Sequence, residues 1–81
     1  MKKSDFLRQC FGGLKKGMTF QVMGGPHDGK IFEITKSTNV KDVDGFNGIE
    51  VTFQDGQIEV CAIQIMMDAI DGLYEHNLKM I

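Results

Sequence analysis

The chain has 81 residues, of which 42% are apolar and 25% charged, and its formal net charge is −2. At this length we expect one domain, residues 1–81, whose modest core argues against a large buried catalytic constellation. The ordinary composition argues against disorder, and no apolar run approaches the ~18 residues that span a bilayer.

The N-terminal residues predict a short amphipathic helix over residues 4–12. Ser4 can cap this helix, and Gly12-Gly13 can end it. The apolar side chains that recur on one face at helical spacing are Phe6, Leu7, Cys10 and Phe11. We expect this face to cover a sheet or barrel end, although a helix this short could also dock onto another chain. Polar residues interrupt the apolar run that a signal peptide requires, so we expect a cytoplasmic protein with no membrane partner.

From Gly17 the apolar pattern changes to period two, which predicts a strand that ends before the stretch GGPHDGK at residues 24–30. This stretch matches the first seven positions of a phosphate-binding loop, G-x-x-x-x-G-K. That loop needs Ser or Thr next and then a helix, whereas Ile31 follows here. Residues 31–35 are rich in β-branched and aromatic side chains, and we expect a second strand from Lys30 to Lys36. We therefore interpret residues 24–29 as a Gly-Pro turn between two strands.

Residues 37–48 are polar and rich in turn-forming side chains, which predicts a longer loop or a wide hairpin. Asp42 and Asp44 resemble the start of a calcium loop. Gly45, however, comes too early for the glycine of such a loop, and Phe53 stands where the bidentate Glu would be. We expect no calcium site here.

Residues 49–60 predict a β-hairpin with a two-residue Asp55-Gly56 turn. That turn would pair Phe53 with Ile58 and Val51 with Val60. The apolar side chains on one face of the hairpin would then be Val51, Phe53, Ile58 and Val60. The side chains on the opposite, wet face would be Glu50, Thr52 and Glu59.

Residues 62–75 predict an amphipathic C-terminal helix. Its apolar residues at helical spacing are Ile63, Met66, Met67, Ile70, Leu73 and Tyr74. In an alternative, the preceding strand continues to Ile65 and only the residues from Met66 onward are helical. We expect the paired methionines, Met66 and Met67, to fill the core. In the alternative, they form an adaptable docking surface for a partner.

The cysteines and histidines match no metal or redox motif. Cys10 and Cys61 lie far apart without a C-x-x-C partner, and we expect two small buried side chains rather than a disulfide. The spacing of these cysteines with His27 and His76 matches no zinc pattern. We expect no metal and no cofactor.

The middle of the chain resembles a KOW-type small barrel with an SH3-like fold. The residues that carry the resemblance are Lys16-Gly17-Met18-Thr19-Phe20-Gln21-Val22, GGPHDGK at 24–30, Ile34, Val51-Thr52-Phe53 and Ile58-Glu59-Val60. They cover about half of the chain, and Phe32 stands where the family usually has a second glycine. With this resemblance, the expected fold is α+β and mainly β: a small antiparallel barrel of four or five strands over residues 17–61, with a helix at each end.

Members of that family commonly bind RNA, ribosomal or transcription components, or other proteins, and are not enzymes in themselves. The resemblance therefore implies a binding module. If the family's use of its barrel rim carries over, the contact positions here are Gly25 to Lys30, preceded by Lys15 and Lys16.

The charges are separated along the chain. Residues 1–36 carry seven basic and three acidic side chains, and residues 37–81 carry two basic and eight acidic ones. Such polarity suits docking onto a charged partner. We expect a non-enzymatic interaction module, such as an adaptor, an accessory subunit or an inhibitor of the kind that phages encode against a host protein. The acidic residues expected to face a basic, nucleic-acid-binding protein are Asp42, Asp44, Glu50, Asp55, Glu59, Asp68 and Asp71. An exposed edge strand could also pair with a second copy of the chain.

Direct RNA or DNA binding is the alternative function. Its contact residues would be Lys15, Lys16, His27, Lys30 and Lys36, with Phe32 or Phe46 as a stacking surface. The sequence pI of about 5.5 argues against it, because nucleic-acid-binding domains are usually basic. Enzymatic activity is the third hypothesis. His27 would act as a general base beside the Asp28 carboxylate, and Cys10 or Cys61 would be the nucleophile. Neighbours on a turn rarely point at each other, so we expect no enzymatic activity.

Overall fold

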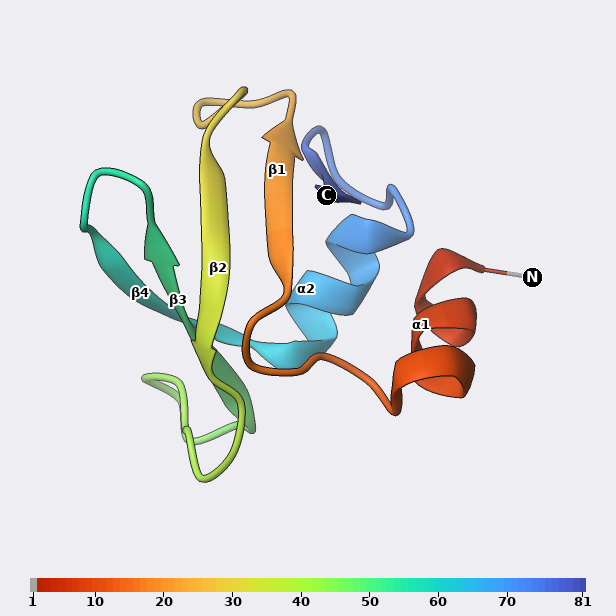
Figure 1. The fold of residues 1–81 in the computed structure, drawn as a ribbon, viewed down its shortest axis with the longest axis vertical. Helices are drawn as coiled ribbons and strands as arrows, with labels where there is room; N and C mark the ends of the chain where they lie inside the picture. The colour runs from red at the N-terminus through yellow and green to blue at the C-terminus, as the bar shows by residue number, and fades with distance from the viewer. Residues whose placement is uncertain (1) are drawn as a thin grey trace.

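The computed structural model describes residues 2–81, which form a five-stranded antiparallel sheet and two helices (Figure 1). The strands lie in the order β4-β3-β2-β1-β5. Their bounds are Thr19–Met23 for β1, Ile31–Lys36 for β2, Gly48–Phe53 for β3, Ile58–Ala62 for β4 and Asn77–Met80 for β5. The helices are α1, Lys3–Phe11, and α2, Ile63–Ile70. The predicted α+β class, mainly β, is confirmed.

The sheet is antiparallel, as predicted, but it is open, so the small SH3-like barrel that we expect from the sequence does not close. β4 and β5 are the two edges of the sheet and do not pair with each other. α2 follows β4 directly in the chain and packs against both β4 and β5. The helix therefore bridges the two edges that a closed barrel would join by hydrogen bonds.

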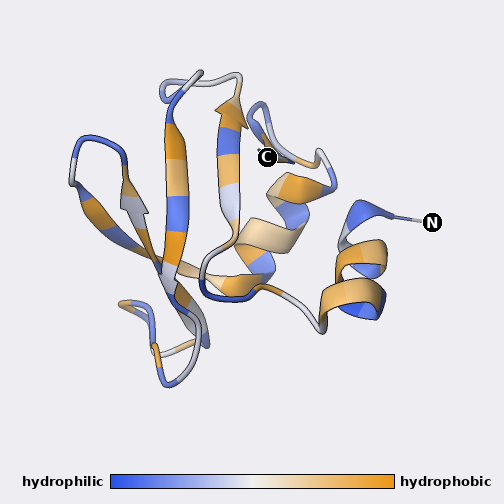
Figure 2. Cartoon of the chain, viewed as in Figure 1, coloured by the Kyte–Doolittle hydropathy of each residue, from blue (hydrophilic) through white to orange (hydrophobic). Residues whose placement is uncertain are grey.

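The turn between β1 and β2 is confirmed at residues 24–29, because β1 ends at Met23 and β2 follows as a strand. The Gly29 N–H donates to the Val22 carbonyl at 2.8 Å. Buried residues alternate with more exposed ones along β1 and β2, and Figure 2 shows a polar position between apolar ones in each strand, as expected of strands with one face in the core. The phosphate-loop reading fails because no helix follows Lys30.

The β3–β4 hairpin has a different register from the predicted one. Gly56 has a φ of +92°, whereas Asp55 keeps a negative φ, so the two-residue turn that needs both residues at positive φ does not form. Instead a three-residue loop closes with the Phe53 N–H bonded to the Gln57 carbonyl at 2.8 Å. Every pairing shifts by one residue, and Ile58 lies opposite Thr52.

The C-terminal helix is shorter than the predicted 62–75. α2 ends at Ile70, where the Leu73 N–H donates to the Asp68 carbonyl and the Gly72 N–H to the Ala69 carbonyl. This is the bonding pattern of a Schellman motif, which stops a helix and lets the chain turn away. The chain then continues as β5, a strand that pairs with β1 and that the sequence pattern did not predict.

The core lies between one face of the sheet and the helices. Its buried members are Leu7, Leu14, Phe20, Val22, Phe32, Ile34, Ile49, Val51, Met66, Met67, Ala69, Ile70 and Leu78. Met66 and Met67 are 4% and 2% exposed, so the prediction that they fill the core is confirmed. We call this side of the sheet the core face and the opposite side the outer face.

The N-terminal helix is confirmed, but its predicted apolar face buries little. Leu7 enters the core, whereas Phe6 and Phe11 are 56% and 49% exposed. Ser4 does not cap the helix, since Lys2 occupies the N-cap position. Cys10 is also exposed, so only Cys61, which is half-buried, approaches the predicted burial, and both thiols are free. Within residues 2–81, no helix has the length and apolar character needed to cross a membrane.

Candidate functional site

Exposed apolar side chains mark the edge strand β4. Ile58 lies opposite Thr52 and Val60 opposite Glu50, so these four side chains share the outer face of the sheet. Ile58 is 60% exposed and Val60 is 45% exposed. The predicted register placed both in the core; the one-residue shift turns them outward, because side chains alternate along a strand.

The backbone of the same two residues points away from the sheet. Hydrogen-bonded and non-hydrogen-bonded pairs alternate along an antiparallel ladder. The Phe53–Gln57 bond at one end and the Ile63 N–H to Asn47 carbonyl bond at the other fix this alternation. The backbone N–H and C=O groups of Glu59 therefore bond to β3, whereas those of Ile58 and Val60 point away from β3, toward solvent. Within residues 2–81, no other backbone group bonds to these outward groups.

We define the β4 edge surface as the side chains and outward backbone groups of Ile58 and Val60. Proteins usually protect such edges with charged side chains, Lys above all, with Pro, with a bulge or with a covering helix. β4 reads Ile-Glu-Val-Cys-Ala: it has no Lys or Pro, and its one charged side chain, Glu59, lies on the core face. The other edge differs in that β5 carries the exposed Lys79, whereas α2 packs against both edge strands. β4 therefore differs from β5 in having no lysine on the edge strand.

Carboxylates flank the β4 edge surface. Glu50, directly opposite Val60, accepts a hydrogen bond from the Thr35 hydroxyl at 2.9 Å. Asp55 lies in the exposed β3–β4 turn, next to the start of β4. Glu59 is on β4 itself but on the core face, opposite Val51. These three of the seven predicted acidic residues adjoin the strand.

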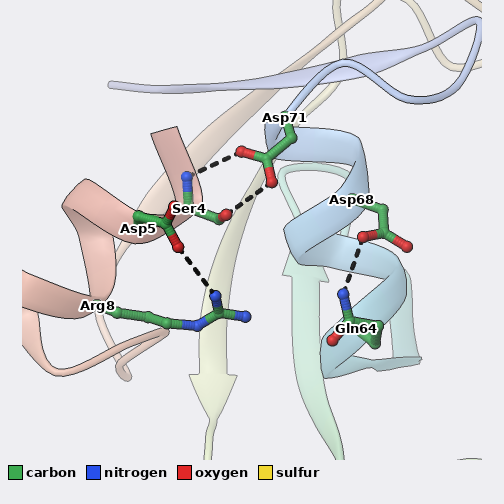
Figure 3. Close-up of polar contacts among 6 residues, drawn as sticks. All are labelled: Ser4, Asp5, Arg8, Gln64, Asp68 and Asp71. Carbon is green, nitrogen blue, oxygen red and sulfur yellow. Dashed lines mark hydrogen bonds and ion pairs between the residues drawn. The ribbon is translucent and has the colours of Figure 1, made fainter. Parts of the chain in front are cut away.

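The other four predicted acidic residues lie elsewhere. Asp42 and Asp44 are in the loop between β2 and β3, where the Asp42 carboxylate accepts the backbone N–H groups of Asp44 at 3.0 Å and Phe46 at 2.9 Å. Asp68 is on α2 and accepts a hydrogen bond from the Gln64 amide at 2.9 Å (Figure 3). The predicted set is therefore not one continuous patch.

Asp71 serves an internal contact between the two helices. Its carboxylate accepts the Ser4 backbone N–H at 2.9 Å and the Ser4 hydroxyl at 2.6 Å (Figure 3). Ser4 lies in the first turn of α1, where backbone N–H groups lack a helical partner and the helix dipole favours negative charge. The side-chain and then the backbone hydrogen bond from Ser4 lower the pKa of Asp71. Asp71 thus replaces the missing side-chain cap of α1.

The five basic residues of the nucleic-acid alternative lie at opposite ends of the sheet. His27 and Lys30 belong to the β1–β2 turn, where the Lys30 ammonium lies 5.9 Å from the centre of the Phe53 ring. Lys36 ends β2, about 20 Å along the strand from Lys30. Lys15 and Lys16 lie beside that second end, because the Gly17 N–H bonds to the Ile34 carbonyl. The structure does not gather the set into one surface.

The two stacking candidates also separate. Phe32 is 4% exposed and lies in the core, with its ring 5.8 Å from that of Phe20. Phe46 is 66% exposed, at the tip of the β2–β3 loop. Only Phe46 is available to a base.

A cavity of about 210 Å³ lies on the core face, beside the β1–β2 turn. We call it the apolar cavity. Its walls come from β1 to β5 and α2, and its principal apolar contacts are Val51, Phe53 and Met66. Polar side chains reach it at His27, His76 and Cys61. Burial raises the pKa of the Cys61 thiol, and the nearby Glu59 carboxylate raises it further, so the thiol stays protonated at neutral pH.

Sequence reasoning missed both the β4 edge surface and the apolar cavity. A three-residue Gln-Asp-Gly loop, with glycine in the last position, was the signal that could have identified the edge. Among residues 2–81, no three His, Cys, Asp or Glu side chains gather in a way that could hold a metal ion.

Comparisons with protein-family models, with curated proteins and with solved structures found no match for this chain. The structure itself defines the fold class, α+β with an open antiparallel sheet. The KOW-type resemblance stays a prediction. Function has to be argued from the site alone.

Proposed function

We propose that this protein is a non-enzymatic protein-interaction module that takes an extended, basic segment of another protein as a sixth strand on β4. An adaptor, an accessory subunit or an inhibitor of a host protein would all use such a site. One observation carries the proposal: Ile58 and Val60 combine free backbone groups with exposed apolar side chains on an edge strand that has no lysine or proline. Strand addition uses both, because backbone hydrogen bonds supply affinity and alternate side chains supply specificity.

The flanking charges favour a basic partner over a second copy of the chain. In an antiparallel pair of two β4 strands, each copy would bring Glu50, Asp55 and Glu59 to the interface. Like charges across an interface oppose association, whereas lysines or arginines on a partner strand would neutralise them. The predicted KOW-type likeness is consistent with a binding role and specifies no partner.

A pair of synthetic peptides tests the proposal directly. One peptide alternates valine with lysine, and its control alternates valine with glutamate. We expect only the basic peptide to slow hydrogen exchange at the outward backbone amides of Ile58 and Val60, as measured by NMR. Peptide binding that leaves these two amides unprotected would overturn strand addition at β4.

Two matched variants test which surface is used. Val60→Lys places a protecting charge on the edge, and Val43→Lys makes the same change at a fully exposed loop valine beside Asp42 and Asp44. We expect V60K to weaken peptide binding at least ~10-fold and V43K to leave it nearly unchanged. Equal affinities in the two variants would exclude the β4 edge surface.

The same variants, used as bait in a pull-down from source lysate at low and moderate salt, distinguish a protein partner from nucleic acid. A protein partner captured by V43K but not by V60K, with or without nuclease, supports the proposal. Recovery that nuclease abolishes would favour nucleic-acid binding instead. Amide protection at Ile58 that rises with protein concentration alone would indicate a homodimer through the edge.

A further inference from the structure

The apolar cavity is bounded by side chains that offer almost no hydrogen bonds. Phe32 and Phe53 meet edge to face with ring centres 5.4 Å apart, and Val51, Met66 and Leu78 contribute further apolar wall. These walls offer water few hydrogen-bond partners, and the polar side chains lie at the rim. The interior therefore favours an apolar occupant over ordered water.

The rim of the apolar cavity is held by two segments that are far apart in the chain. The β1–β2 turn packs so tightly on residues 75–76 that a Cβ on Gly24 would lie 2.8 Å from the Glu75 carbonyl oxygen. The Asp28 carboxylate accepts the Gly24 N–H at 2.6 Å and fixes the turn. A rim that is already ordered costs a ligand little conformational entropy.

Each rim segment brings one imidazole to the cavity. The His27 ring is tilted over Phe53 at 6.4 Å, and the His76 ring stacks on Tyr74 at 5.5 Å. Imidazole nitrogens can donate or accept a hydrogen bond, so they can fix one polar group of an otherwise apolar ligand. The Cys61 thiol provides a third, weaker contact from β4.

We propose that the apolar cavity binds a small, neutral aromatic molecule of one or two fused rings, with one polar group at the histidine rim. An apolar cavity of about 150 Å³ holds benzene, and this one of about 210 Å³ is larger by roughly one further ring. A charged ligand is excluded because the apolar walls would strip its hydration without replacing it. The site is on the core face and does not depend on the proposed partner at the outer face of β4.

Indole is the probe, since it has two fused rings and one N–H donor. We expect saturable shifts of the backbone amide signals of Cys61, Ala69 and Leu78 in an NMR titration, with a Kd on the order of 100 µM. Indole-3-acetate is the matched control, and its carboxylate should weaken binding at least ~10-fold. Absence of saturable shifts for indole up to millimolar concentrations would overturn the proposal, as would equal binding of the two compounds.

Filling variants locate the binding. Ala69→Met extends a wall residue that is 2% exposed into the apolar cavity, and Val43→Met adds the same side chain at a fully exposed position. We expect A69M to weaken indole binding at least ~10-fold and V43M to leave it unchanged. If far-UV circular dichroism shows that A69M fails to fold, Cys61→Met decides, because Cys61 is only half-buried. Indole binding that survives filling would place the ligand elsewhere.

Alkylation of Cys61 gives a readout independent of the shifts. In a Cys10→Ser protein, Cys61 is the only thiol. Saturating indole should slow its reaction with iodoacetamide several-fold, because the ligand covers the thiol from the cavity side. An unchanged rate at saturation would contradict binding in the apolar cavity.

Discussion

The register of the β3–β4 hairpin decides which face of β4 meets the core, and two identical substitutions can measure it. Val51 is 1% exposed, whereas Val60 is 45% exposed. In the observed register, Val51→Ala removes two methyl groups from the core and Val60→Ala removes two from a half-wet edge. In the two-residue-turn register the two valines would face each other in the core, and both substitutions would cost the same.

The sizes follow from burial. Two buried methyl groups are worth about 1.6 kcal/mol of transfer free energy, and the residual cavity brings the cost of V51A to about 2–3 kcal/mol. Val60 is 45% exposed, so V60A loses about half of that transfer free energy and leaves no cavity. Its expected loss in the free energy of unfolding is about 0.5–1 kcal/mol. At roughly 4–8 °C per kcal/mol for a domain of this size, Tm should fall by at least ~8 °C in V51A and by less than that in V60A.

Urea unfolding followed by far-UV circular dichroism is the assay, because the chain has no tryptophan to report by fluorescence. The slope of free energy against urea should be the same in both variants, which shows that the denatured states are comparable. Equal losses in V51A and V60A, or a larger loss in V60A, would refute the observed register and with it the β4 edge surface.

Two further predictions concern the turn and the helix contact. Gly24→Ala should lower the free energy of unfolding more than Gly29→Ala in the same urea assay: both glycines have a φ of +85°, but only a Cβ at Gly24 meets a backbone atom, the Glu75 carbonyl oxygen. Equal losses would mean that this close approach is absent. Asp71→Asn should lower stability at neutral pH by weakening the bonds from Ser4. Because the fold lowers the Asp71 pKa from 3.8, its contribution is full above about pH 5 and is lost as pH falls through the folded pKa. The native and D71N stabilities should therefore converge in acid, and a constant gap from pH 7 to pH 3 would contradict this role.

Local patterns were enough to predict most of the elements. The period-two run before Gly24, the Gly-Pro turn and the β-branched run after Lys30 each indicate one structure, and all three are confirmed. The helical spacing around Met66 was equally clear. These predictions succeeded because each depends on the covalent geometry and polarity of neighbouring residues, without any distant contact.

The register of the hairpin could not be read in the same way. The letters Asp55-Gly56 fit a two-residue turn with two positive φ angles and a three-residue loop with one. Glycine adopts a positive φ without steric strain, whereas for aspartate this conformation is unfavourable. Of the two turn residues, only Gly56 has a positive φ. The one-residue difference leaves the strands in place but exchanges the two faces of β4. The candidate site was therefore missed although its hairpin was found.

The end of α2 was mispredicted because apolar spacing continues past the true helix end. Leu73 and Tyr74 lie where a longer stripe would place them, yet they are 63% and 42% exposed. Ending at Ile70 frees the following residues to return as β5 beside β1, where Leu78 becomes buried. That long-range pairing carries no local signal, and it also removed the barrel closure expected from the resemblance.

The two edges of the open sheet can be compared as alternative solutions to one physical problem. Unpaired strand edges promote association, and β5 opposes this with the exposed Lys79, while α2 packs beside both edge strands. β4 is likewise a short strand with an unpaired backbone edge, and it exposes Ile58 and Val60 without a lysine beside them. Replacing either by lysine would cost little stability, since neither is buried, so folding does not require these apolar side chains. These side chains leave a surface prone to association, and the partner strand that we propose would cover it.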